Sequence, residues 1–110
     1  MSVQEQATLR ESLARRQAEL EVKRLFEQVR SGKARMEKLA DLADLSRQNH
    51  EAQRRDYSNG LVTNLEVLQA TTSWQVSLRN LERQQYALKS DYVKLQAAAG
   101  KRAELKTEVD

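Results

Sequence analysis

The fold of this chain is decided by one stretch, residues 56–66, which reads DYSNGLVTNLE. Asn59 and Gly60 both tolerate a positive φ, the backbone conformation that ends many helices on their C-terminal side. Thr63 and Glu66 have the spacing of a capping box, in which each side chain accepts a hydrogen bond from the backbone amide of the other. The stretch therefore predicts that one helix ends, the chain reverses within a few residues, and a second helix begins.

The composition is typical of long helices that pair rather than of a globular core. Of the 110 residues, 32% are charged and 5% aromatic, and the chain holds three glycines and no proline. Chains of this kind form coiled coils, in which two helices bury only the seam between them. We predict a single all-α domain, a long antiparallel helical hairpin of the coiled-coil type.

Several classes of function are disfavoured by the same composition. Cysteine is absent, which excludes disulfides and thiol chemistry. The net charge of +3 is modest and uneven, since Lys and Arg exceed Asp and Glu only in residues 1–55, so a nucleic-acid partner is not expected. No stretch approaches the ~20 apolar residues that a membrane-spanning helix needs, so this chain is not expected to cross a bilayer.

The hairpin is predicted over residues 1–100, with a first helix at about 6–58, a tip at 59–63 and a second helix at about 64–99. Gly100 is a plausible helix stop, so the tail 101–110 is expected to be a frayed continuation or disordered. The predicted seam of the first helix follows coiled-coil spacing through Val22, Leu25, Val29, Gly32, Met36, Leu39, Ala43, Ser46, His50, Gln53 and Tyr57. The predicted seam of the second comprises Val67, Thr71, Trp74, Leu78, Leu81, Gln85, Leu88, Tyr92, Leu95 and Ala99.

Each helix also carries a second, weaker apolar stripe. On the first helix it includes Leu42, Leu45 and Ala52, and on the second it includes Leu65, Leu68, Thr72, Val76, Tyr86, Val93 and Ala97. An isolated hairpin needs only one seam, so a second stripe predicts neighbouring helices on both sides. This arrangement suits a ring or barrel of helices.

The tip resembles that of a known family. The run from Tyr57 to Gly60, then Thr63, the run from Leu65 to Leu68, and Ala70 are similar to the tip signature of the TolC-type outer membrane efflux proteins. The resemblance covers about residues 10–100 and corresponds to the second helical repeat of that family. The tip motif is fairly specific, whereas the helices alone are similar to any coiled coil.

The resemblance implies a fold, a function and partners. The chain would be the periplasmic part of a Gram-negative outer membrane protein, a fragment of a trimeric α-barrel. The intact homotrimer would be a passive exit duct for small molecules, toxins or metal ions. A periplasmic adaptor protein would join it to an inner-membrane pump, and the hairpin tips would form the pore entrance.

The resemblance also implies roles for individual residues. Asn59, Gly60, Leu61, Val62 and Thr63 match the tip loop that the adaptor would contact. Some relatives carry an arginine at the position of Val62 and an aspartate at the position of Gln69, and this sequence has neither. A gate here would therefore rest on Asp56, Tyr57, Glu66 and Gln69.

Each of these residues also has a plainer interpretation. Tyr57 is equally well the last seam residue of the first helix, and Glu66 is a helix-capping residue before it is a pore-lining one. His50, the single histidine, is expected in the seam or at the surface, because one histidine cannot form a histidine-based metal cluster. Trp74 is expected to serve packing.

No catalytic constellation stands out, so we predict no enzyme activity, no cofactor and no metal site. Two alternatives to the duct stay open. The chain can be a free-standing coiled-coil scaffold, or the hairpin of a periplasmic adaptor that packs tip to tip. A basic helical nucleic-acid binder ranks last.

Overall fold

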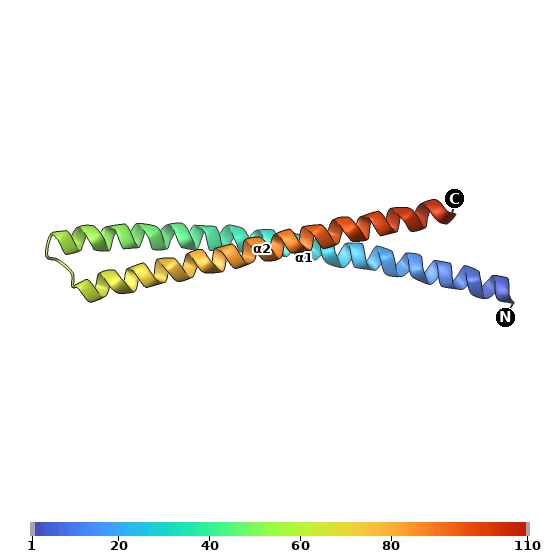
Figure 1. The fold of residues 1–110 in the computed structure, drawn as a ribbon, viewed down its shortest axis with the longest axis horizontal. Helices are drawn as coiled ribbons and strands as arrows, with labels where there is room; N and C mark the ends of the chain where they lie inside the picture. Colours follow the sequence, from blue (N-terminus) through green and yellow to red (C-terminus); the bar gives the residue numbers. More distant parts are fainter. Residues whose placement is uncertain (1, 110) are drawn as a thin grey trace. The chain divides into compact units, whose positions relative to one another are not determined.

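The computed structural model describes the backbone of residues 2–109 and the side chains of residues 2–105. It contains two helices, α1 (Val3–Ser58) and α2 (Asn64–Val109), joined by residues 59–63 (Figure 1). The chain divides into two compact units. Unit 1 combines Met1–Ser31 with Leu88–Asp110, and unit 2 is Gly32–Ala87. The prediction of an all-α chain with two long helices is thus confirmed.

The N-terminal end of α1 is fixed by a capping box that the sequence analysis did not identify. The Glu5 amide donates to Ser2 Oγ at 3.2 Å, and the Ser2 amide donates to Glu5 Oε2 at 3.4 Å. This pair satisfies backbone donors that have no partner inside the helix. As a result α1 begins at Val3, slightly before the predicted start.

The C-terminal end of α2 lies beyond the predicted boundary near residue 99 and agrees with the alternative that the tail continues the helix. Helical backbone continues through Gly100 to Val109, so residues 101–109 belong to α2, and Asp110 lies outside the described residues. Gly100 does not take the left-handed backbone that would stop the helix, since Gly60 is the one described residue with a positive φ. Beyond Gly100, Leu105 is half-buried and lines a groove with Ala14 and Ala18 of α1, which favours continuation of α2.

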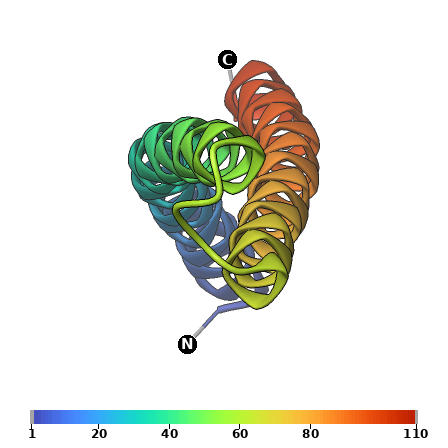
Figure 2. The same cartoon turned by 90° about the vertical axis from the view of Figure 1, so that its left-hand side faces the viewer.

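In unit 2 the two helices run antiparallel and side by side (Figures 1 and 2). Gln84 Nε2 donates to the Gly32 carbonyl at 3.3 Å, and the hydroxyl oxygens of Ser46 and Ser77 lie 3.1 Å apart. As the residue number rises along α1, the number of its partner on α2 falls. Unit 2 is therefore the helical hairpin that the sequence predicts.

The predicted seam of α1 is confirmed except at its last position. Its members are buried or half-buried, in steps of three and four residues, from Val22 to Gln53. Tyr57 is 50% exposed, so it is not a seam residue. The helix ends immediately after Tyr57, and the preceding residue, Asp56, is the half-buried one.

The predicted seam of α2 is correct in every second position and, apart from Thr71, wrong in between. Val67, Trp74, Leu81, Leu88 and Leu95 are buried or half-buried as predicted. Leu78, Gln85, Tyr92 and Ala99 are exposed, while Thr71 is half-buried beside the seam. The alternate seam positions lie one residue earlier, at the small or polar side chains of Ala70, Ser77, Gln84, Asp91 and Ala98. Apolar residues therefore alternate with small or polar ones along this seam, and the small ones let the two helix backbones approach closely.

Unit 1 is held by the same kind of seam. Leu25 and Val29 of α1 and Leu88 of α2 are its buried apolar residues. On its surface, Arg24 and Glu21 form an ion pair at 2.6 Å. This hydrogen bond lowers the pKa of the Glu21 carboxyl and raises the pKa of Arg24. Both side chains are exposed, so the pair contributes little to stability.

Candidate functional site

The hairpin tip begins where α1 ends in a Schellman motif. Gly60 has φ +73°, in the left-handed region that an L side chain rarely adopts. The Leu61 amide donates to the Asp56 carbonyl at 2.8 Å, and the Gly60 amide donates to the Tyr57 carbonyl at 3.0 Å. These two bonds satisfy carbonyls that the end of a helix otherwise leaves free. Of the two residues predicted to allow a positive φ, Gly60 alone adopts it.

The start of α2 is the capping box predicted from the sequence. The Thr63 amide donates to Glu66 Oε2 at 3.0 Å, and the Glu66 amide donates to Thr63 Oγ1 at 3.4 Å. The Glu66 carboxylate also lies in the first turn of α2, where the helix dipole favours negative charge. The tip is therefore closed on both sides by local hydrogen bonds.

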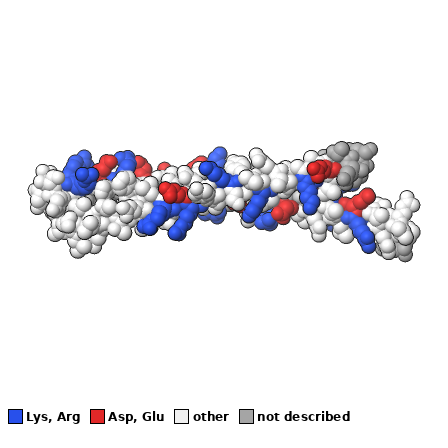
Figure 3. Space-filling model, viewed as in Figure 1, with Lys and Arg blue, Asp and Glu red and all other residues white. Residues whose placement is uncertain are grey.

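This closed turn displays apolar side chains to solvent. Leu61 is 73% exposed at the turn, and Tyr57, Leu65 and Leu68 on the two helix ends beside it are also exposed. Seen end-on in Figure 2, the loop bends to one side and then crosses to the start of α2. On the face shown in Figure 3, charged side chains at the loop end of unit 2 gather along one edge, over α1, while the surface over the start of α2 is free of charge. A contiguous group of exposed apolar side chains, unlike a single one, is a feature of surfaces that contact other proteins.

A small crevice brings together part of the predicted gate. It has a volume of about 260 Å³ and is lined by Asn49, Gln53, Val62, Glu66, Gln69, Ala70 and Ser73. Glu66 and Gln69 thus share one crevice with Val62 of the tip loop. Asp56 and Tyr57 do not line it: the Asp56 carbonyl is used in the Schellman motif, and Tyr57 is exposed.

Asn49 and Gln53 are among the crevice residues that were not predicted as site residues. They lie four residues apart on α1, so they share one face of the helix. Gln53 Oε1 is buried and has no hydrogen-bond partner among the described residues. Only the position of Gln53 in the seam indicated that it would face α2.

The second apolar stripes of unit 2 lie open to solvent, apart from Ala52, which is half-buried. Leu42 and Leu45 of α1 are exposed, as are Leu65, Leu68, Val76 and Tyr86 of α2. None of these residues is used in the seam between the two helices. Unit 2 therefore presents apolar side chains away from its own seam, as the prediction of lateral neighbours requires.

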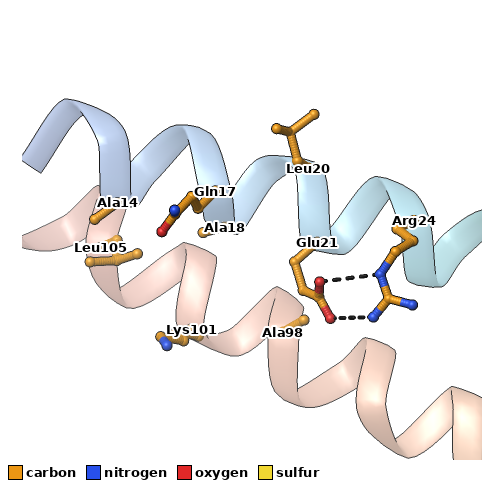
Figure 4. A pocket seen from close by; sticks show the side chains of 9 residues that line it. All are labelled: Ala14, Gln17, Ala18, Leu20, Glu21, Arg24, Ala98, Lys101 and Leu105. Carbon is orange, nitrogen blue, oxygen red and sulfur yellow. Dashed lines mark hydrogen bonds and ion pairs between the residues drawn. The ribbon is translucent and has the colours of Figure 1, made fainter.

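Unit 1 contains a larger groove of about 550 Å³ (Figure 4). Three alanines, two leucines and the aliphatic part of longer side chains line it: Ala14, Gln17, Ala18, Leu20, Glu21, Arg24, Ala98, Lys101 and Leu105. The Glu21–Arg24 ion pair lies at its edge (Figure 4). The alanines leave the space, because short side chains on facing helices do not fill the seam.

Within the described residues, no group of three or more His, Cys, Asp or Glu side chains is placed to hold a metal ion. In the same part of the chain, neither helix has a segment long and apolar enough to cross a membrane. Comparison with protein-family models, curated protein sequences and solved structures gave no match. The site must therefore be interpreted from its own geometry.

The backbone at Gly60 should be the most sensitive position of the tip. We expect Gly60→Ala to lower the free energy of unfolding by about 1–2 kcal/mol, the cost of a left-handed L residue. A Cβ there would meet no atom within 4 Å, so the effect would come from φ alone. Gly100→Ala is the matched control: it also has open space but helical backbone, and should stabilise by about 0.5–1 kcal/mol. Thermal unfolding followed by circular dichroism measures both, and equal effects would contradict the Schellman motif.

Glu66 allows the capping role to be separated from the role of its charge. Glu66→Gln keeps a side-chain acceptor for the Thr63 amide and should leave stability within about 0.5 kcal/mol of the original chain. Glu66→Ala removes that acceptor and should cost about 1 kcal/mol. The free energies of unfolding of the two variants, measured by urea denaturation, distinguish the capping role from the role of the charge. A loss with Gln as large as that with Ala would show that the carboxylate charge, rather than the cap, is what the tip needs.

Proposed function

We propose that this chain is the periplasmic helical hairpin of an outer-membrane efflux duct, with a tip that docks on a periplasmic adaptor protein. One observation carries the proposal. The Schellman motif and the capping box hold a short loop in one conformation, and that loop exposes Leu61 and its apolar neighbours to solvent. A rigid, uncharged, protruding surface loses little conformational entropy when it binds, which favours docking.

The open apolar stripes support a role in a pore wall. In an α-barrel, each helix contacts its hairpin partner on one side and a neighbouring hairpin on the other. Leu42 and Leu45 of α1 and Leu68 and Val76 of α2 would meet such neighbours in the intact homotrimer. The resemblance of the tip sequence to TolC-type proteins points to the same assembly.

The proposed mechanism is mechanical. The adaptor would contact Asn59, Gly60, Leu61, Val62 and Thr63, and the inner-membrane pump would deliver its substrate to the entrance. Glu66 and Gln69 share the crevice behind the loop, and with Asp56 and Tyr57 they would shape the entrance. The helices would move along their seam, where two contacts in the half of unit 2 nearer the tip, Ser46–Ser77 and His50–Trp74, are between polar or aromatic side chains.

A single-cysteine cross-linking experiment tests the docking role, because the chain has no cysteine of its own. Leu61→Cys would be introduced into the gene product in cells of the source organism, and a short bifunctional cross-linker applied. We expect a cross-linked product that contains a periplasmic adaptor protein. Arg35→Cys, an exposed position on α1 away from the loop, is the matched control and should give no such product.

Two results would contradict the proposal. Cross-linking of Leu61→Cys only to copies of the chain itself, or to proteins unrelated to export, would favour the coiled-coil scaffold instead. Equal cross-linking of the adaptor to Leu61→Cys and to Arg35→Cys would show that general proximity, and not docking at the tip, produces the cross-link.

A further inference from the structure

Unit 1 contains a second groove, with a volume of about 450 Å³, which shares Leu20 with the groove of Figure 4. Leu20, Val22 and Phe26 of α1 give this second groove its apolar surface. Leu20 and Phe26 are 59% and 56% exposed, and Leu20 points away from α2 in Figure 4. Both therefore belong to apolar surface that the packing of α1 against α2 does not use.

Cations outnumber carboxylates in this second groove. Arg16 and Lys23 of α1 and Arg102 of α2 contribute three positive charges, and Glu19 contributes the one negative charge. Among the described residues, none of these four side chains takes part in a hydrogen bond or an ion pair. The three cations can therefore bind an anion, unlike Arg24 beside the first groove, which is already held in an ion pair.

The charged and apolar groups alternate along one side of α1. Arg16, Leu20 and Lys23 follow one another in steps of four and three residues, and Phe26 comes three residues later. Residues at these spacings share one side of a helix, here over a length of about 15 Å. Arg102 reaches the same groove from α2. The groove thus has an apolar strip with cations at its edges.

We propose that this second groove binds an anionic amphiphile, a small molecule with a carboxylate or similar head group and a single alkyl tail. The head group would bind the cations of Arg16, Lys23 and Arg102, and the tail would lie against the apolar side chains between them. Hydrogen bonds from guanidinium and ammonium groups to a carboxylate are charge-assisted and stronger than those between neutral groups. The proposal uses only the surface of unit 1, so it does not depend on the proposed duct.

The size of the groove favours a small molecule over a partner protein. Its volume lies in the range of small-molecule sites, which combine an apolar lining with a few placed polar groups. Seven residues line it, whereas a protein interface takes on the order of 20–30 residues from each side. A cationic amphiphile would meet the same apolar surface, but three like charges would repel its head group.

Titration of the complete chain with sodium dodecanoate, kept below its micelle concentration, tests this site. Calorimetry gives the affinity, and heteronuclear NMR gives the residues whose amide signals move. We expect shifts centred on residues 16–26 of α1 and on Arg102 of α2. Dodecanoate should bind at least about tenfold more tightly than octanoate, because each methylene withdrawn from water contributes up to about fourfold. Dodecyltrimethylammonium should bind about tenfold more weakly than dodecanoate, since it lacks the charge-assisted hydrogen bonds.

Two double variants with the same change in net charge test which cations matter. Arg16→Gln with Lys23→Gln removes two cations of the groove, and Arg35→Gln with Lys38→Gln removes two cations of α1 outside unit 1. All four side chains are exposed, so both variants should fold, which circular dichroism checks. The groove variant should bind dodecanoate about tenfold more weakly. The control variant should stay within about twofold of the original chain.

Three results would overturn the proposal. Equal losses of affinity in the two double variants, or equal affinities for amphiphiles of either charge, would show an adventitious additive only. Binding of the chain to phosphatidylglycerol vesicles without binding of monomeric dodecanoate would assign this surface to a membrane instead. The comparison of head groups uses the original chain alone, so it tests the site whether or not the variants fold.

Discussion

The left-handed backbone at Gly60 is the constraint on which the hairpin depends. A helix rich in alanine, leucine and charged residues has no reason of its own to stop, because each further residue adds a hydrogen bond. At Gly60 the chain turns away, and the amides of Gly60 and Leu61 bond back to the last carbonyls of α1. The capping box at Thr63 then starts α2. The antiparallel pairing of unit 2 follows from these few local bonds.

The seam of unit 2 combines this rigid turn with a soft interface. Near the loop it is built from a serine pair, a histidine–tryptophan contact and small residues, instead of the leucines that usually fill a coiled coil. Such an interface gives less stabilisation per turn than an apolar one. A large side chain does occur in it: Trp74 is half-buried and its ring packs against that of His50.

The sequence predicted the tip well because its information is local. Gly60, Thr63 and Glu66 act within a few residues of one another, so their spacing alone indicates the hydrogen bonds. The seam of α2 was predicted less well. Apolar character favoured Leu78 and Tyr92 as seam residues. The structure instead buries Ser77 and leaves Asp91 half-buried. The register set by Trp74 and Leu88, together with the fit to α1, decides which face of α2 turns inward.

Other features depend on contacts between the two helices and could not be predicted from the sequence of one segment. The crevice joins Asn49 and Gln53 of α1 to Glu66 and Gln69 of α2, which are distant in sequence. Gly100 has the residue type of a helix stop, yet α2 continues, with Leu105 beyond it facing Ala14 of α1. A glycine permits a stop but does not enforce one, and its surroundings decide.

The most direct test of this account is the distance between spin labels on Leu45→Cys and Leu78→Cys, diluted with unlabelled chain so that only distances within one chain count. Both side chains are exposed, so labels there should be tolerated. The account predicts a short distance between the two labels, because they lie on adjacent helices whose axes are about 8–10 Å apart. A separation near 50 Å, which one continuous helix through Gly60 would give at ~1.5 Å per residue, would contradict it.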